Sequence, residues 1–171
     1  TARGLGGKRP FCLLAPGAGK PEKRWPARAC ADFLRLTGRA HPGTDWVVLT
    51  GPEEAGLESA LRREGVRIPV FTGALRAAGA LMTVCRGMVC MDSGPKHVAV
   101  ALGTRTLTLW TQEPRAEWHP YDAKKHMVVP AASGRVSDIP AALVASRASS
   151  HFRLDTAARE GASGASGGTP T

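Results

Sequence analysis

The sequence predicts an α/β fold in which helices cover both faces of a parallel sheet. Short apolar runs that fit buried strands alternate about five times with segments of helical periodicity, and turns containing Gly and Pro separate them. The chain has 171 residues, of which 43% are hydrophobic, enough for one domain with a substantial core. Because strands and helices alternate, we expect a Rossmann-like, doubly wound parallel sheet with right-handed crossovers.

The elements follow one another in a regular order. Strands are expected at 11–15, 46–49, 67–71, 88–91 and 106–110, with a further short strand at 127–129. Helices are expected at 25–36, 53–63, 75–84 and 137–148, and another runs from the turn after Asp92 to Leu102. Gly38 and Gly65 are expected to end the first two helices, because glycine readily adopts the left-handed conformation that follows many helices.

The ends of the chain differ in composition from its middle. Residues 1–10 are rich in Gly and basic residues and are expected to form a linker, whereas 11–152 form the domain itself. Gly, Ala, Ser and Thr dominate residues 153–171, which predicts a disordered, low-complexity tail. Thr1 is not an initiator methionine, so we expect the chain to be part of something longer.

The net charge of +9 is large, but by itself it does not identify one class of ligand. A basic chain can bind nucleic acid, a membrane surface or a phosphorylated small molecule. The basic residues are scattered, however, and the chain has one Tyr and four Phe. A nucleic-acid-binding domain needs basic and aromatic residues gathered on one surface, so this alternative is disfavoured and no nucleic acid partner is expected.

The four cysteines, Cys12, Cys30, Cys85 and Cys90, form no Cys-x-x-Cys pair and have apolar or helical surroundings. We therefore expect buried, reduced thiols, which favours a cytoplasmic location. The histidines show no metal-ligand spacing, so neither a metal nor another cofactor is expected. No apolar run reaches the ~20 residues that a membrane-spanning helix needs.

The turn at 92–97, Asp-Ser-Gly-Pro-Lys-His, is the most informative stretch of the sequence. It lies between a strand and a helix, where the N–H groups of the first helical turn can bind an anion. Asp92 or Ser93 can cap the helix, and Pro95 suits its first turn. No Gly-x-Ser-x-Gly motif surrounds Ser93, which argues against a hydrolase. We expect this turn to bind the phosphate and sugar of a ligand.

The loops that follow the predicted strands, at 17–24, 50–54, 72–75, 92–97 and 110–121, are expected to converge at one functional edge of the sheet. The sequence Gly-Ala-Gly-Lys at 17–20 matches neither the P-loop nor the dinucleotide fingerprint. It can approach phosphate through its backbone, with help from Lys20 and Lys23, or be a solvated basic loop. The acids Glu53 and Glu54 can accept hydrogen bonds from ribose hydroxyls, or simply favour the start of a helix.

Aromatic residues near the end of the fifth strand leave two alternatives open. Trp110, Trp118 and Tyr121 lie in or just after that strand. They can stack on a base, or pack against the edge of the domain.

Three motifs occur in a characteristic order: Lys-Arg-Trp-Pro at 23–26, Thr-Gly-Pro-Glu-Glu at 50–54 and Asp-Ser-Gly-Pro-Lys-His-Val-Ala at 92–99. Over residues 11–121 the chain resembles the C-terminal domain of glycosyltransferase family 9, the ADP-heptose:lipopolysaccharide heptosyltransferases and their relatives. The resemblance implies the nucleotide-sugar-binding half of a GT-B fold. It also implies an inverting transferase that moves heptose or a related sugar to a glycan or lipopolysaccharide acceptor.

The resemblance also implies roles for individual residues. The donor-binding residues it indicates are Gly17, Ala18, Lys23, Glu54 (with Glu53 in reserve), Asp92, Ser93, Gly94 and His97. Lys23, Gly17 and Ala18 are expected near phosphate, and Glu54 near ribose. The 92–94 turn is expected near the sugar and diphosphate, with His97 bracing it. The segment 73–92 is a few residues shorter than in the family, so no base-contacting residue is assigned.

The family's catalytic carboxylate lies in an N-terminal domain that this sequence does not contain. No catalytic residue is therefore expected here, and the chain alone is expected to be inactive. The implied partners are an ADP-heptose-like nucleotide-sugar donor and a glycan or lipid-linked acceptor bound through the N-terminal domain, and a peripheral membrane contact is compatible with them. Another GT-B-like nucleotide-sugar enzyme, such as a sugar epimerase, is the alternative.

Overall fold

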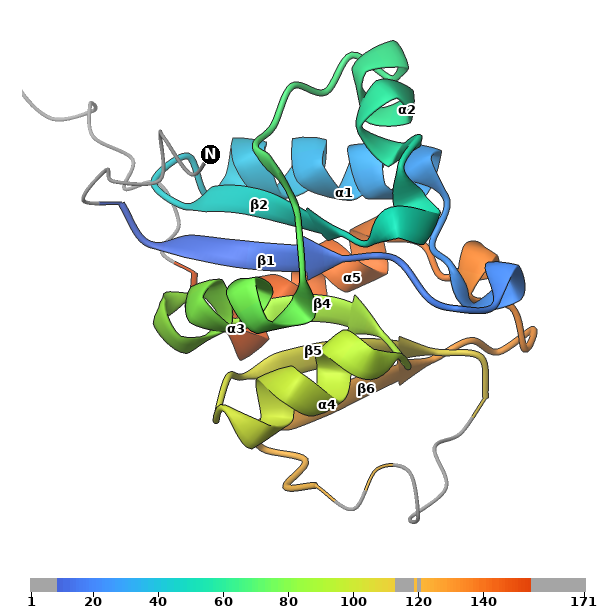
Figure 1. Cartoon of the computed structure of the whole chain (residues 1–171). Coiled ribbons are helices and arrows are strands. Elements are labelled where there is room, and N and C mark those ends of the chain that lie inside the picture. Colours follow the sequence, from blue (N-terminus) through green and yellow to red (C-terminus); the bar gives the residue numbers. More distant parts are fainter. Residues whose placement is uncertain (1–8, 113–118, 120, 155–171) are drawn as a thin grey trace, which may run out of the picture.

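A six-stranded, all-parallel sheet with the order β3-β2-β1-β4-β5-β6 forms the centre of the computed structural model, which describes residues 9–112, 119 and 121–154 (Figure 1). The strands are β1 (Phe11–Ala15), β2 (Asp45–Thr50), β3 (Val70–Thr72), β4 (Met88–Met91), β5 (Thr106–Trp110) and β6 (His126–Pro130). β2 and β3 are added successively on one side of β1, and β4, β5 and β6 are added successively on its other side. The predicted doubly wound parallel sheet is confirmed.

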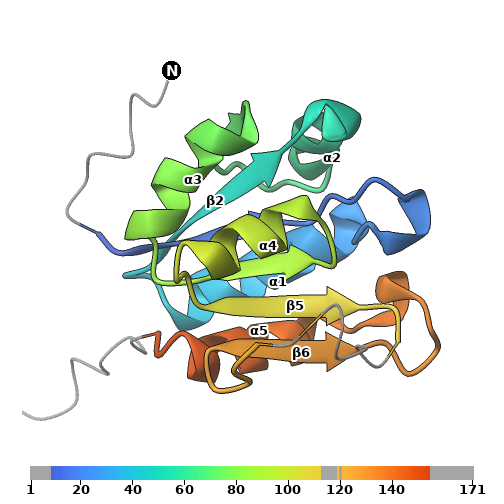
Figure 2. The same ribbon diagram turned by 60° about the horizontal axis from the view of Figure 1, so that its bottom comes forward.

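Helices cover both faces of this sheet. They are α1 (Ala27–Ala40), α2 (Leu57–Arg63), α3 (Leu75–Val84), α4 (Gly94–Ala101) and α5 (Ala141–His151), and the short 3-10 turns are η1 (Pro21–Lys23), η2 (Pro52–Glu54) and η3 (Val136–Asp138). Figures 1 and 2 show α3 and α4 together on one face, with α1 and α5 on the other. Successive crossovers therefore bury the sheet on both sides.

Alternating residues of the strands serve two separate cores. Cys12 and Leu14 of β1 pack toward α1 and α5, whereas Leu13 and Ala15 pack toward α3 and α4. This alternation follows from the two-residue repeat of a strand, and it explains why the strands read as continuous apolar runs.

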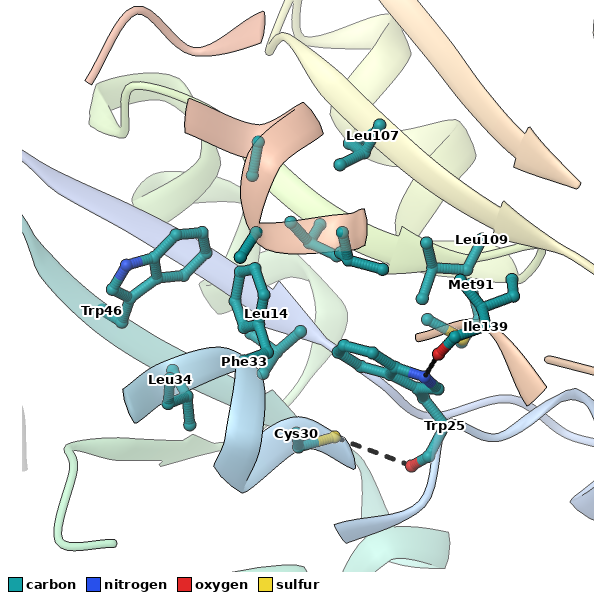
Figure 3. Packing of buried hydrophobic residues seen from close by; sticks show 14 of the residues in the cluster. Leu14, Trp25, Cys30, Phe33, Leu34, Trp46, Met91, Leu107, Leu109 and Ile139 are labelled. Carbon is teal, nitrogen blue, oxygen red and sulfur yellow. Dashed lines mark hydrogen bonds between the residues drawn. The ribbon is translucent and has the colours of Figure 1, made fainter. Parts of the chain in front are cut away.

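Aromatic rings fill the larger core (Figure 3). Phe33 of α1 lies between Trp25 and Trp46, with edge-on ring centroids 5.8 and 4.7 Å away. Trp25 also donates from its ring N–H to the carbonyl of Ile139 at 3.4 Å, which joins the start of α1 to the segment before α5. The loop that follows β1 is thereby fixed at its far end.

Several predicted boundaries are wrong, including that of the third strand, which was expected at 67–71 and is Val70–Thr72. Gly38 does not end α1, which continues to Ala40; Gly38 lacks a positive φ, and the buried face of the helix extends to Thr37. The segment predicted as one helix from 53 splits into η2 and α2. The last helix begins at Ala141 rather than Ser137, because Pro140 occupies its N-cap. Gly65, with φ of 76°, follows α2 as expected.

The thiol prediction is confirmed for three cysteines. Cys12, Cys30 and Cys90 are buried and free, and burial raises the pKa of each to about 12. Cys85 is free but only partly buried, with its pKa raised by burial to about 11.

Most of the predicted linker and tail lies outside the described residues. Within the described part of the chain, no helix has both the length and the apolar character needed to cross a membrane.

Candidate functional site

The loops that follow β1, β2 and β4 meet at the carboxyl edge of the sheet. β1 and β4 are neighbours, with Ala15 paired to Cys90, so the chain leaves their ends on opposite sides of the sheet. In open α/β sheets this switch point forms a crevice in which ligands bind. Two adjoining cavities open here, and both are lined by Ser93 and Gly94 at the start of α4.

The first cavity, of about 560 Å³, lies beside β1, β2 and β3 and is mainly apolar. Its apolar lining includes Leu49, Phe71, Leu75, Ala78 and Met82. Its rim carries Thr50, Glu54 and Ser93. The hydroxyls of Thr50 and Thr72 are hydrogen-bonded to each other at 2.7 Å, at the ends of their neighbouring strands. An apolar cavity with a few polar groups at its rim is typical of a small-molecule site.

Glu54 places a carboxylate directly against the β1 loop. Its side chain is only 13% exposed, and Oε2 accepts a 2.8 Å hydrogen bond from the N–H of Gly51. A Cβ atom on Gly17 would lie 2.3 Å from Cδ of Glu54, so the close approach of this carboxylate requires glycine at 17. The structure therefore brings Gly17, predicted from the first loop, and Glu54, predicted from the second, into contact.

Glu53 is placed differently from its neighbour. Its side chain is 59% exposed, and it pairs with the guanidinium of Arg24 at 2.8 Å. Arg24 also donates from Nε to the carbonyl of Ala18 at 2.7 Å, which fixes the β1 loop. Glu54 is thus the more enclosed acid, and Glu53 and Arg24 support the loop from outside.

The second cavity, of about 440 Å³, lies beyond β4 and β5 and is more polar. It is lined by Lys23, Asp92, Ser93, Gly94, His97, Trp110, Thr111 and Gln112. Five of the predicted residues therefore surround one cavity. Gly17, Ala18 and Glu54 line the first cavity, so all eight predicted residues line one cavity or the other.

Asp92 is held between two lysines that come from different segments. Lys23 of η1 reaches Oδ2 at 3.0 Å, and Lys96 of α4 reaches Oδ1 at 2.7 Å. Burial opposes ionisation of this carboxyl, but the hydrogen bonds and charges of Lys96 and Lys23 outweigh it, so the pKa of Asp92 lies below its usual range. Asp92 is therefore an anion between two cations at neutral pH.

The start of α4 differs in detail from the expectation. Ser93 is the N-cap residue, as one of the two alternatives predicted, but its side chain does not cap the helix. The hydroxyl lies 3.5 Å from the carbonyl of Met91, and the carboxylate of Asp92 is engaged by the lysines. Pro95 lies in the first turn, as predicted. Ser93 and Gly94 consequently present polar groups to both cavities.

His97 connects α4 to the segment that follows β5. Its Nδ1 is hydrogen-bonded to the hydroxyl of Tyr121 at 2.8 Å, and the Tyr121 ring also lies edge-on to His119 and His126. Burial lowers the pKa of His97, His119 and His126, so these imidazoles are neutral near pH 7. Trp110 is buried, which favours packing over stacking on a ligand, and Trp118 lies outside the described residues.

Sequence reasoning missed two sets of residues in the site. Lys96 was absent from the predicted residues, although its spacing of four from Asp92 on a helical turn indicates a side-chain pair. Phe71 and Met82 belong to a segment predicted as a strand and a segment predicted as a helix, with no role in the site, and their lining of a cavity depends on the crossing of separate elements. Among the described residues, no three His, Cys, Asp or Glu side chains are arranged to hold a metal ion.

Together, the parallel sheet and the crevice at its switch point define a Rossmann-like α/β domain with a candidate ligand site at the carboxyl ends of its strands. The chain belongs to glycosyltransferase family 9 (heptosyltransferase), whose family model matches residues 1–136. The resemblance inferred from the three motifs is confirmed.

Solved structures agree with this assignment of the fold. A family 9 glycosyl transferase from Veillonella parvula is 22% identical with a TM-score of 0.73, and the match covers 86% of this chain and 47% of that one. E. coli ADP-heptose lps heptosyltransferase II is 21% identical with a TM-score of 0.71, over 85% of this chain and 47% of that one. E. coli heptosyltransferase WaaC, solved with ADP, is 17% identical with a TM-score of 0.71, over 84% and 44%.

These matches cover a little less than half of each of those solved chains. No curated protein matches the chain significantly. The chain thus has the fold of one half of a GT-B glycosyltransferase.

Proposed function

We propose that residues 11–152 form the donor-binding domain of an inverting glycosyltransferase, which holds a nucleoside-diphosphate sugar while the sugar is transferred. The observation that carries this proposal is the pair of adjoining cavities, one apolar and one polar, that share Ser93 and Gly94. A nucleotide sugar has the same division, because an apolar base and a ribose are joined through a diphosphate to a polar sugar. The described elements, from β1 to α5, fall within this range.

The first cavity suits the nucleoside. Phe71, Leu75 and Met82 offer apolar surface to a base, while the enclosed carboxylate of Glu54 can accept hydrogen bonds from ribose hydroxyls. Gly17 and Ala18 lie beside this carboxylate and allow the ligand close to the backbone. E. coli WaaC was solved with ADP and with ADP-2-deoxy-2-fluoro heptose, which supports an ADP-type donor.

The second cavity suits the diphosphate and the sugar. Lys23 provides a partly exposed ammonium, and the first turn of α4 provides backbone N–H groups and the positive end of a helix dipole. The hydroxyl of Ser93, the carboxylate of Asp92 and the ring of His97 line the same space and can bind sugar hydroxyls.

These groups contribute to one part of the transfer reaction. As the bond between the anomeric carbon and the diphosphate breaks, negative charge grows on the leaving diphosphate, and fixed cations and N–H dipoles stabilise it. The base that removes the acceptor's hydroxyl proton is expected in the N-terminal half of the enzyme, together with the glycan or lipopolysaccharide acceptor site. The chain alone is therefore proposed to bind donor without transferring the sugar.

A cytoplasmic location accompanies this function. The four free thiols support a reducing compartment. A peripheral contact with a membrane would bring the enzyme to a lipid-linked acceptor, and the net charge of +9 favours an anionic surface.

Calorimetric titration of the complete protein with ADP, UDP, GDP and ADP-heptose tests the proposal. We expect saturable binding at one site, with a preference for one base. The nucleotide sugar that carries this base should bind more tightly than the corresponding free nucleoside diphosphate. A folded protein that binds none of these ligands would refute the proposal. Binding of DNA that nucleotide sugars do not displace would favour the nucleic-acid alternative.

A further inference from the structure

Lys96 is a lysine whose side chain is completely removed from solvent. It is 0% exposed, and it lies on α4 in contact with Asp92 and Trp110, which both line the second cavity. Its ammonium lies 2.7 Å from Oδ1 of Asp92 and 4.1 Å from the ring centroid of Trp110. Burying a charge is costly unless a partner compensates it, and an apolar side chain of similar volume would fill this space without that cost. The charge itself therefore calls for an explanation.

The two lysines that share Asp92 differ in freedom. Lys96 is enclosed, and the Trp110 ring helps to hold its ammonium in place. Lys23 comes from the separate loop after β1, is 31% exposed, and lines the cavity. Asp92 is itself only 18% exposed, so a carboxylate here needs at least one cation beside it.

We propose that Lys96 is a positioning residue that keeps Asp92 paired, so that Lys23 can turn from Asp92 to the diphosphate of the donor. This inference rests on the proposed function, since it assigns Lys23 a phosphate ligand. With Lys96 in place, the movement of Lys23 leaves Asp92 an ion pair at 2.7 Å. Without Lys96, the same movement would leave an enclosed carboxylate with no cation, and Lys23 would stay on Asp92.

The main experiment is a double-mutant cycle on ADP affinity, measured by calorimetry on the complete protein. Lys96→Met keeps the volume of the side chain and removes its charge. We expect it to weaken ADP binding about 10-fold, the scale of one charge-assisted hydrogen bond. In the Lys23→Ala background, Lys96→Met should change the affinity less than about twofold, because Lys96 acts through Lys23.

Two further variants make the cycle specific. Asp92→Asn combined with Lys96→Met should bring ADP affinity back to within about threefold of the wild type, since no carboxylate then retains Lys23. Lys124→Met removes an exposed lysine outside both cavities and should leave the affinity unchanged. Thermal unfolding of each variant shows whether a lost affinity reflects a lost fold.

A measurement made without nucleotide tests separately whether Lys96 keeps the Asp92 carboxylate paired. The carboxyl carbon of Asp92, followed by NMR as the pH falls, should titrate at a higher pH in Lys96→Met than in the wild type. Among the described residues, the charges of Lys96 and Lys23 lower the pKa of Asp92, and Lys96 is the closer of the two. His97, His119 and Cys90 also interact electrostatically with this carboxyl.

The outcomes separate this inference from the proposed function. Wild-type affinity in Lys96→Met would overturn the inference and leave the donor-binding proposal intact. An equal loss in the wild-type and Lys23→Ala backgrounds would also overturn it, because Lys96 would then act on the ligand directly. Absence of nucleotide binding by the folded wild-type protein would overturn the proposed function, and this role of Lys96 with it.

Discussion

The two sides of the switch point present different surfaces to a ligand. On the side of β1 to β3, the cavity is apolar, and its one enclosed acid, Glu54, is held by a backbone N–H and a glycine contact. On the side of β4 and β5, the cavity is polar, and a buried lysine, Lys96, and a partly exposed lysine, Lys23, share one aspartate. Shape thus governs the first side and charge the second, so substitutions should divide in the same way.

The largest expected effect is on stability, from Asp92→Ala. This change removes the Asp92 carboxylate from a fully buried lysine, Lys96, and removing one partner of a buried pair costs about 3–5 kcal/mol. The matched change on the other side is Glu53→Ala, which removes an exposed partner of Arg24 and should cost no more than about 1 kcal/mol. Urea unfolding measures both. Equal losses of unfolding free energy would contradict the assignment of a buried pair to the β4 side.

The second effect is on phosphate binding, from Lys23→Ala. Loss of a charge-assisted hydrogen bond, about 1.5–3 kcal/mol, should weaken ADP and pyrophosphate about 10- to 100-fold. Asp92 keeps Lys96 as its partner, so the unfolding free energy should change little. Calorimetry with both ligands measures the effect. Wild-type affinity for pyrophosphate would show that the diphosphate does not bind on this side.

The third effect separates the nucleoside side from the phosphate side. A Cβ atom on Gly17 would collide with the Glu54 carboxylate, whereas one on Gly38, which lines neither cavity, would meet nothing within 4 Å. Gly17→Ala should therefore displace Glu54 and weaken ADP binding about 10-fold, the scale of one hydrogen bond to a charged group, while Gly38→Ala leaves the affinity unchanged. Neither change should alter pyrophosphate binding. Equal ADP affinities in the two variants would remove Glu54 from the nucleoside site.

The smallest effect is a dependence of stability on pH that comes from the β4–β6 side. Burial lowers the pKa of His97, His119, His126 and His151 below the ordinary value of 6.5. The unfolded chain then binds more protons than the folded one just below pH 6.5, so stability is complete above that pH and falls as the pH drops through it. Urea unfolding at pH 7.5 and 5.5 should show lower stability at 5.5. An unchanged midpoint would contradict the burial of these imidazoles.

The fold could be predicted from the sequence because the patterns that indicate its strands and helices are local. In the part of the chain that the structure describes, alternation of apolar runs and helical periodicity located each strand and each α-helix to within a few residues. The boundaries that failed depend on the tertiary structure: α1 continues through Gly38 because its buried face packs beyond that point, and Pro140 delays α5. Propensity alone does not decide such ends.

The candidate site could be predicted only in part from the sequence. The 92–97 turn carries its chemistry in consecutive residues, so its place after a strand indicated a ligand site. The contact of Gly17 with Glu54 and the sharing of Asp92 by Lys23 and Lys96 join segments far apart in the chain. No local pattern encodes those distances, and the apolar lining from Phe71, Leu75 and Met82 resembles ordinary core.

A crystal structure of the complete protein with ADP tests most directly the claim that both cavities hold a single nucleotide. We predict the base in the cavity lined by Phe71 and Met82, the ribose at Glu54, and the diphosphate between Lys23 and the first turn of α4. Lys23 should have left Asp92, while the Lys96–Asp92 pair remains. A nucleotide bound elsewhere, or one whose diphosphate lies away from Lys23 and α4, would contradict the account.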